Sequence, residues 1–132
     1  MLNHIELMGR LTADPELRKT QAGVSVSTFT LAVERDFGGK DGEKITDFIT
    51  CVAWRQTGDF AAKYFHKGDM AIVSGSLQMR KWMDKEGKPR ISAEVITDNM
   101  YFGQSKKAKG ESKDADEPQF TPMPDDDGDL PF

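Results

Sequence analysis

Apolar and polar residues alternate with a period of two along several segments of this chain, and turn-forming residues separate these segments. The segments with this pattern are 5–11, 24–34, 45–54, 70–82 and 90–102. Alternation with period two is typical of β-strands that have one face in a core and the other toward solvent. The pattern therefore predicts five strands and an all-β domain.

The phase of the alternation predicts which side chains enter the core. The inward set is Ile5, Leu7, Gly9, Leu11, Phe29, Leu31, Val33, Ile49, Cys51, Ala53, Val73, Gly75, Leu77 and Met79. Val24 and Val26 fall on the opposite parity to Phe29 within one segment. A change of parity within a strand indicates a β-bulge or a strong bend between these positions.

One segment has a helical pattern. Residues 59–66 begin with an acid, Asp59, place Phe60 and Tyr64 four residues apart, and precede Gly68, a residue that commonly ends helices. Five strands with a helix between the third and the fourth is the order of an OB-fold, a partly open Greek-key barrel. We therefore expect an OB-fold over residues 1–104, although other small β-barrels share this order.

Charge and proline content divide the chain in two. Residues 1–104 hold 14 basic and 14 acidic side chains, whereas residues 105–132 hold four lysines, eight acids and four of the six prolines. A segment with few apolar residues and many charges cannot bury enough surface to offset its chain entropy. We expect 105–132 to be a disordered linker and acidic tail.

Large rings occupy strand positions where polar side chains are expected. Phe48 and Trp54 alternate with the inward residues of segment 45–54, Trp82 shares its parity with Arg80, and Phe37 lies in a glycine-rich loop. An aromatic ring beside cations can stack an unpaired base, and stacking tolerates any sequence because every base has a π-face. The four rings together predict a single-stranded nucleic-acid interface, although any one of them would also suit a core or a subunit interface.

Basic side chains accompany these rings, although the domain is neutral overall. Their positions predict a track of phosphate contacts, with acids such as Glu6, Glu16 and Asp59 placed elsewhere. The predicted phosphate contacts are Arg10, Arg35, Arg55, Lys67, Arg80, Lys81, Lys88 and Arg90.

Catalytic patterns are absent from the sequence. It contains no GxSxG, HExxH, Walker A or GxGxxG motif, and the one cysteine, Cys51, lies on a predicted inward face. We expect neither an enzyme, nor a metal site, nor a cofactor. The beginning of the chain lacks the pattern of a secretory signal, and no segment is apolar enough to span a bilayer, so we expect a cytoplasmic protein without membrane contact.

The acidic end of the sequence carries two apolar residues that a solvated tail cannot bury. Such a tip suits capture by a protein with an apolar pocket and a basic rim. The predicted partner-binding residues are Asp125, Asp126, Asp127, Asp129, Leu130, Pro131 and Phe132. The simpler alternative is an acidic tail without a partner.

Several blocks of the sequence match one known family. They are Met1-Leu2-Asn3, Gly9-Arg10-Leu11, Asp14-Pro15-Glu16-Leu17-Arg18, residues 29–33, residues 47–55, Lys67-Gly68, residues 75–82 and the acidic Pro131-Phe132 tip. With these blocks the chain resembles the bacterial-type single-stranded DNA-binding proteins. Gly128 within the acidic run, and a short linker with few Gly and Gln residues, depart from the family pattern.

The resemblance implies an OB-fold that assembles into a homotetramer around which single-stranded DNA wraps. It implies that Phe37, Phe48, Trp54 and Trp82 stack bases, that Arg80 and Lys81 contact phosphates, and that the tip docks proteins of replication, recombination and repair in the nucleoid. Two other readings of the residues remain open: an RNA-binding OB-fold, and an assembly subunit that touches nucleic acid only incidentally.

Overall fold

A computed structural model describes residues 1–104 of the chain, so the predicted disordered segment 105–132 and its acidic tip lie outside the described residues. The elements in chain order are β1 (Ile5–Leu11), β2 (Glu16–Lys19), β3 (Ser25–Glu34), the short 3-10 helix η1 (Lys40–Gly42), β4 (Thr46–Trp54), α1 (Arg55–Tyr64), β5 (Met70–Met83) and β6 (Pro89–Phe102).

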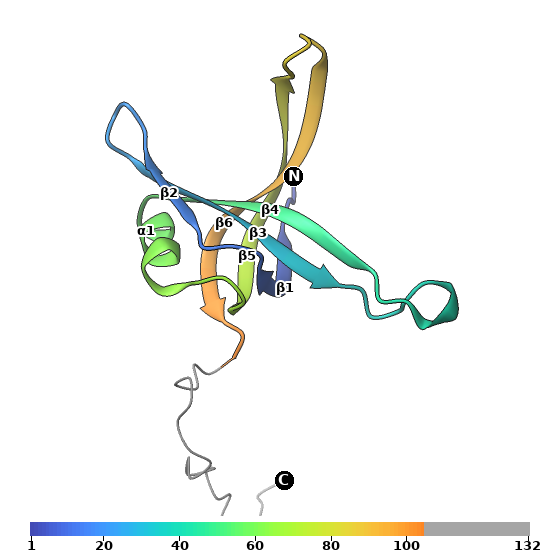
Figure 1. Ribbon diagram of the computed structural model, residues 1–132. Helices are drawn as coiled ribbons and strands as arrows, with labels where there is room; N and C mark the ends of the chain where they lie inside the picture. Colours follow the sequence, from blue (N-terminus) through green and yellow to red (C-terminus); the bar gives the residue numbers. More distant parts are fainter. Residues whose placement is uncertain (105–132) are drawn as a thin grey trace, which may run out of the picture.

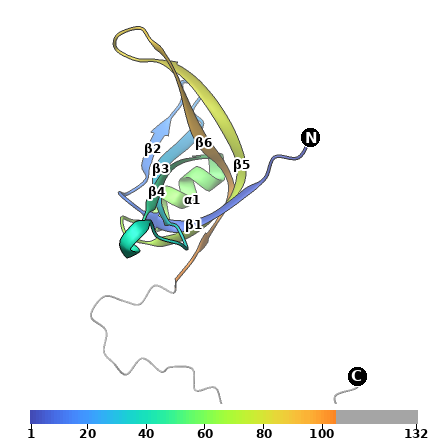
Figure 2. The same cartoon turned by 90° about the vertical axis from the view of Figure 1, so that its right-hand side faces the viewer.

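The strands form a barrel with the topology of an OB-fold. They follow the order β1-β5-β6-β4-β3-β2, and a second pairing of β1 with β3, at Arg10–Ala32 and Leu11–Leu31, closes the barrel. Among the strand pairs within residues 1–104, only β4–β6 is parallel. Figures 1 and 2 show the strands wrapping into the barrel and the β5–β6 hairpin projecting beyond it. The predicted fold class is confirmed, with the additional short strand β2.

The core lies where the predicted phase placed it on four strands, with Leu11, Leu31, Cys51 and Val73 fully buried. Val95 of β6, whose phase was not predicted, joins this core, and Phe65 packs with it from the end of α1. Burial of these side chains supplies most of the favourable free energy of folding in a domain of this size.

The change of parity in segment 24–34 was predicted to mark a β-bulge or a strong bend, and the pairing of β3 with β4 contains no bulge. The pairing of β3 with β4 runs without a shift from Val26–Trp54 to Glu34–Thr46. The apolar residues change parity because the first two inward positions of β3 are occupied by serines, Ser25 and Ser27. The Ser27 hydroxyl donates a 2.7 Å hydrogen bond to the Gly58 carbonyl. A buried serine with a partner can thus occupy a position that period-two reasoning reserves for an apolar residue.

An irregular pairing occurs instead on β5, between Ser74 and Gly75. A Cβ atom at Gly75 would lie 1.9 Å from the Ile96 carbonyl oxygen, which no side chain tolerates. Glycine at this position therefore allows β5 and β6 to approach each other closely.

The helix begins four residues earlier than predicted. Strand β4 passes into α1 without a loop, because Arg55 takes a left-handed backbone conformation (φ 59°) directly after Trp54. Asp59 therefore lies within the helix and not at its start.

The hairpin explains a further error. Leu77 and Met79 were predicted to face the core, but they are 41% and 61% exposed. Their phase is correct, but the outer part of β5 and β6 extends past the barrel, where no other element of residues 1–104 covers these two side chains.

Candidate nucleic-acid interface

Strand register joins the even-numbered residues of four strands into one outer surface. Trp54 pairs with Val26 of β3, Val52 pairs with Ile96 of β6, and Ile96 pairs with Ser76 of β5. Side chains of paired residues point to the same side of a sheet. We call this surface the even face; it consists of the even-numbered residues within 26–32, 48–54, 76–82 and 90–96.

Three of the four predicted stacking residues lie on the even face and are accessible. Phe48 is 69% exposed, Trp54 44% and Trp82 40%. Phe37 is more exposed still and lies in the loop between β3 and β4. None of these rings is sealed in the interior, so all four are available to a ligand.

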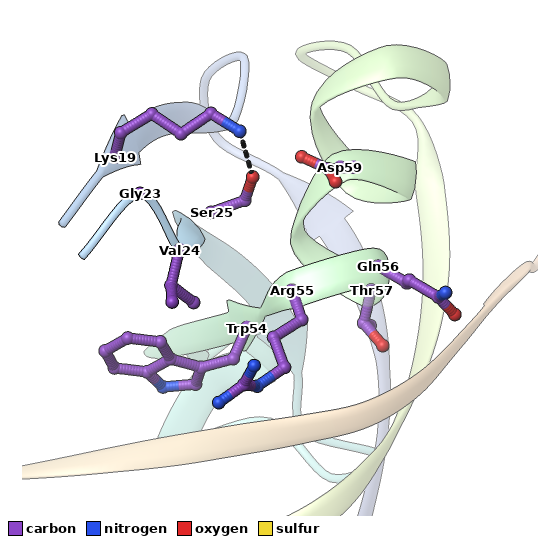
Figure 3. A pocket seen from close by; sticks show the side chains of 9 residues that line it. All are labelled: Lys19, Gly23, Val24, Ser25, Trp54, Arg55, Gln56, Thr57 and Asp59. Atoms are coloured by element: carbon purple, nitrogen blue, oxygen red, sulfur yellow. Dashed lines mark hydrogen bonds between the residues drawn. The ribbon is translucent and has the colours of Figure 1, made fainter.

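Trp54 borders an open pocket of about 650 Å³ between the end of β4, the start of α1 and the β2–β3 turn (Figure 3). Arg55 lines the same pocket, and its guanidinium has no partner among the described residues. The pocket thus combines a ring with a cation. Asp59, predicted to lie away from the aromatic strands, also lines it, so that prediction was wrong for this acid.

Three arginines among the predicted phosphate contacts are hydrogen-bonded to carboxylates. Arg35 donates to Asp47 at 2.9 and 3.0 Å, Arg80 donates to Glu94, and Arg90 donates to Asp84 at 3.1 Å. Hydrogen bonding between Arg35 and Asp47 raises the pKa of Arg35 and lowers the pKa of Asp47. All three arginines keep more than half of their side-chain surface exposed, so they can still meet a phosphate.

The remaining predicted cations are spread over the domain. Arg10 joins the row of Ala32 and Phe48 across β1, β3 and β4, and donates a 3.0 Å bond to the Gly68 carbonyl. Lys67 precedes β5, far along the chain from the hairpin tip where Lys88 pairs with Glu86. Lys81 has odd parity and therefore belongs to the opposite side of the hairpin from Arg80 and Trp82.

Asp47, Asp84, Ser92 and Glu94 contact the predicted site residues but were missed by sequence reasoning. Ser92 accepts a 2.7 Å hydrogen bond from the Trp82 indole nitrogen. A signal was present for two of them, because Ser92 and Glu94 share the parity of Arg90 on one strand. Polar residues opposite a core face are ordinary, however, and this signal alone could not distinguish them from solvated surface.

The sequence of the described domain matches one known protein family. A model described as the single-strand binding protein family matches residues 2–103. The chain belongs to this family.

Curated relatives agree with the family match. The chain is 46% identical over 106 residues to single-stranded DNA-binding protein 2 of Listeria monocytogenes, covering 80% of this chain and 66% of the relative. It is 47% identical over 109 residues to single-stranded DNA-binding protein 1 of Staphylococcus aureus, covering 83% and 65%. It is 43% identical over 113 residues to the single-stranded DNA-binding protein of Bacillus cereus, covering 86% of this chain and 66% of the relative. The matched part is slightly less than two thirds of each relative's own length.

The described residues show no grouping suited to a metal ion, that is, no cluster of three or more His, Cys, Asp or Glu side chains. Within residues 1–104 no helix is both long and apolar enough to cross a membrane.

Cys51 is fully buried, and this burial raises the pKa of its thiol to about 12. We expect the native protein at pH 8 to react slowly with a disulfide-forming thiol reagent, because the thiolate is the reactive form. The same protein in denaturant should react at the rate of a free cysteine. Rapid stoichiometric labelling of the native protein would show that this strand opens. The pKa of the Cys51 thiol is higher in the folded state than in the unfolded state. The contribution of this thiol to the stability of the fold is therefore complete below about pH 9 and is lost as the pH rises toward 12.

Proposed function

We propose that this chain binds single-stranded DNA without sequence preference and without catalysis. The bases stack on Phe37, Phe48, Trp54 and Trp82, and the neighbouring arginines and lysines neutralise phosphates. The observation that carries the proposal is the even face, on which the register of four strands gathers three exposed rings beside Arg80 and Arg90. The relatives named above are DNA-binding proteins by name, which supports the same conclusion.

Competition between nucleic acids tests this proposal. A labelled oligo-dT should be displaced by unlabelled oligo-dT and oligo-dC, and much less by duplex DNA, whose bases are already stacked. Affinity should fall as salt rises, since phosphate neutralisation releases counterions. Stronger displacement by oligo-rU would favour the RNA-binding reading, and no binding of any single strand would favour the assembly-subunit reading.

We also propose that the functional form is a homotetramer. This follows the family resemblance, and one feature of the fold supports self-association. Strand β1 pairs with β5 over Ile5–Arg10 but with β3 only at Arg10 and Leu11, which leaves one edge of Ile5–Gly9 without a strand partner among the described residues. An open strand edge can pair with a second copy.

Light scattering during size exclusion should give four times the mass of one chain; a monomer would refute the proposed tetramer.

The acidic segment 125–132 is proposed to recruit proteins of replication, recombination and repair, placing the protein at single-stranded DNA in the cytoplasmic nucleoid. Its support is chemical: four carboxylates precede Leu130, Pro131 and Phe132. Such an end fits a pocket with an apolar floor and a basic rim.

Deletion of 125–132 should leave the affinity for oligo-dT unchanged or slightly raised, because the deletion removes negative charge that competes with DNA for the cations. The same deletion should abolish capture of repair proteins from extract, and Phe132→Ala should largely reproduce that loss. A marked fall in DNA affinity on deletion would contradict this division of roles.

A further inference from the structure

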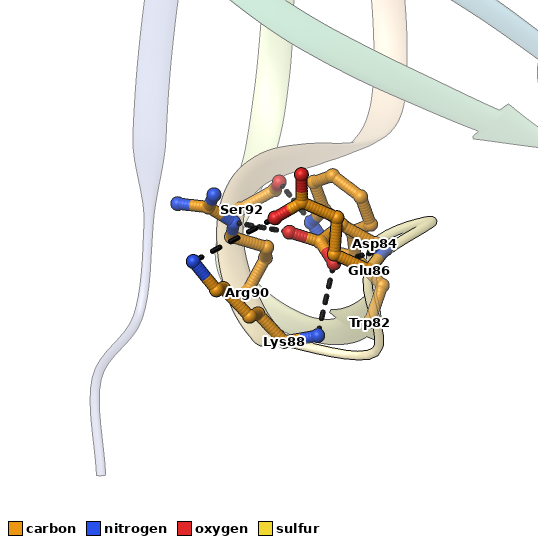
Figure 4. A network of polar contacts seen from close by, with 6 residues as sticks. All are labelled: Trp82, Asp84, Glu86, Lys88, Arg90 and Ser92. Carbon is orange, nitrogen blue, oxygen red and sulfur yellow. Dashed lines mark hydrogen bonds and ion pairs between the residues drawn. The ribbon is translucent and has the colours of Figure 1, made fainter.

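Three side-chain contacts cross the β5–β6 hairpin in parallel. Residues on β5 and in the following turn each meet a residue diagonally across on β6, and successive contacts are two residues apart. The contacts are Arg80 with Glu94, Trp82 with Ser92, and Asp84 with Arg90 (the last two appear in Figure 4). Trp82 therefore lies between two arginine–carboxylate pairs.

In both outer pairs the acid is sheltered and the base is exposed. The Glu94 side chain is 13% exposed against 60% for Arg80, and Asp84 is 17% exposed against 56% for Arg90. The exposed surface pair of Arg18 with Glu16 differs, because both of its side chains are open at 72% and 64%. The two acids are thus sheltered from solvent, whereas the arginines that they hold remain accessible.

The hydrogen bonds leave the outer part of each guanidinium free. Arg80 and Arg90 each donate through Nε, and their terminal nitrogens donate no hydrogen bond within the described residues. An arginine has five N–H donors in a planar fork, and the two terminal nitrogens are suited to bidentate contact with a phosphate. Binding through Nε therefore orients each arginine without using the atoms that a phosphate needs.

Asp84 also organises the turn that carries this arrangement. Its Oδ1 accepts hydrogen bonds from the backbone N–H groups of Glu86 and Lys88, both at 2.9 Å, while its Oδ2 accepts from Arg90. The bond from the Lys88 backbone, followed by those from Arg90 and Glu86, lowers the pKa of Asp84, so its carboxylate is ionised at neutral pH. The two oxygens thus have separate roles that a substitution can divide.

We propose that Asp84 and Glu94 are positioning residues for DNA binding, each holding an arginine by its Nε so that its terminal nitrogens face the phosphates on either side of the base stacked on Trp82. This inference rests on the proposed function. It makes the hairpin a pre-arranged site for one base and its two flanking phosphates. Ordering a long side chain before binding removes part of the entropic cost of the complex.

Asp84→Asn separates the two roles of Asp84. The amide oxygen can still accept from the two backbone N–H groups, whereas the amide nitrogen in place of Oδ2 cannot accept from Arg90. Glu86→Gln is the matched control, because it removes the same charge from the same turn and Glu86 forms an ion pair with Lys88 and with no arginine among the described residues. We expect Asp84→Asn to bind oligo-dT about 3- to 10-fold more weakly than Glu86→Gln at fixed salt.

Glu94 offers a second pair of variants. Glu94→Leu removes the acceptor and should weaken binding about 3- to 10-fold, whereas Glu94→Gln keeps an acceptor oxygen for Arg80 and should bind nearly as tightly as the parent. If the carboxylates instead repelled DNA, both Glu94 variants and Asp84→Asn would bind more tightly than the parent. That result would overturn the proposal.

Variants that already lack the arginine distinguish a loss of arginine positioning from general damage to the hairpin. In Arg90→Ala protein, adding Asp84→Asn should cause no further loss of affinity; in Arg80→Ala protein, the same should hold for Glu94→Leu. A further loss in either background would also overturn the proposal. Binding of oligo-dT by the parent and by Glu86→Gln reports on the proposed function separately, so the inference can fail while that function stands.

Discussion

Replacing Trp82 by alanine is expected to weaken binding of oligo-dT by about 1–3 kcal/mol, or about 5- to 150-fold in affinity. The indole is 40% exposed on the even face, and Ser92 holds its ring nitrogen, so the ring is already ordered for stacking. Equilibrium titration at a single salt concentration measures the loss. Trp82→Phe should recover much of the affinity, since a smaller ring still stacks.

Met83→Ala is the matched control for this substitution. Met83 is the next residue on β5, is 67% exposed, and has the opposite parity, so its side chain belongs to the other side of the hairpin. We expect its affinity for oligo-dT to be within a factor of two of the parent. Equal losses in the two variants would place DNA elsewhere than on the even face.

Replacing Phe65 by alanine is expected to lower the free energy of unfolding by about 3–5 kcal/mol. The ring is fully buried, stacks on Phe102 with 4.4 Å between centroids, and meets the edge of Phe60 at 5.8 Å. Its loss leaves a cavity where α1 meets the barrel. Urea denaturation followed by circular dichroism measures the change.

Phe48→Ala is the matched control for Phe65→Ala, because the same change from phenylalanine to alanine is made at an exposed position. Phe48 is 69% exposed and contributes little to the core, so its removal should change stability by less than about 0.5 kcal/mol while weakening DNA binding. A large stability loss in Phe48→Ala, or a small one in Phe65→Ala, would show that the inner and outer faces of β4 and α1 have been assigned incorrectly.

The barrel could be predicted because its strands alternate clearly. Leu31, Cys51 and Val73 combine the correct phase with complete burial, and the helix between β4 and β5 then selects the topology. Strand β2 could not be predicted, because all four of its residues, Glu16–Lys19, are exposed and no alternation marks them. It exists through pairing with β3, which is a tertiary contact.

A period-two pattern predicts which side chains of a strand share a face, but not whether another part of the protein covers that face. Leu77 and Met79 have the inward phase, yet the hairpin carries them past the barrel. Ser27 lacks an apolar side chain, yet it enters the core because the Gly58 carbonyl accepts a hydrogen bond from its hydroxyl. In both cases a partner distant in sequence decides burial, and a local pattern contains no information about that partner.

Phe48, Trp54 and Trp82 are exposed as expected because strand parity places them opposite the core. The acids that hold the arginines were not found, because the pairing of Arg80 with Glu94 depends on the register between β5 and β6. Once the turn at Asp84 sets that register, every diagonal contact across the hairpin follows from it. Turn geometry thus links a short loop to the arrangement of the whole site.

The proposed DNA binding depends on aromatic rings of the even face stacking on unpaired bases. Trp54 and Trp82 are the only two tryptophans in the chain, so titration of the intrinsic fluorescence with poly-dT reports on them directly. We predict strong, saturable quenching at low salt, reduced by about half in each of Trp54→Phe and Trp82→Phe, with a midpoint that moves to higher DNA concentration as salt increases. Saturable binding of poly-dT with unchanged tryptophan emission would contradict the account.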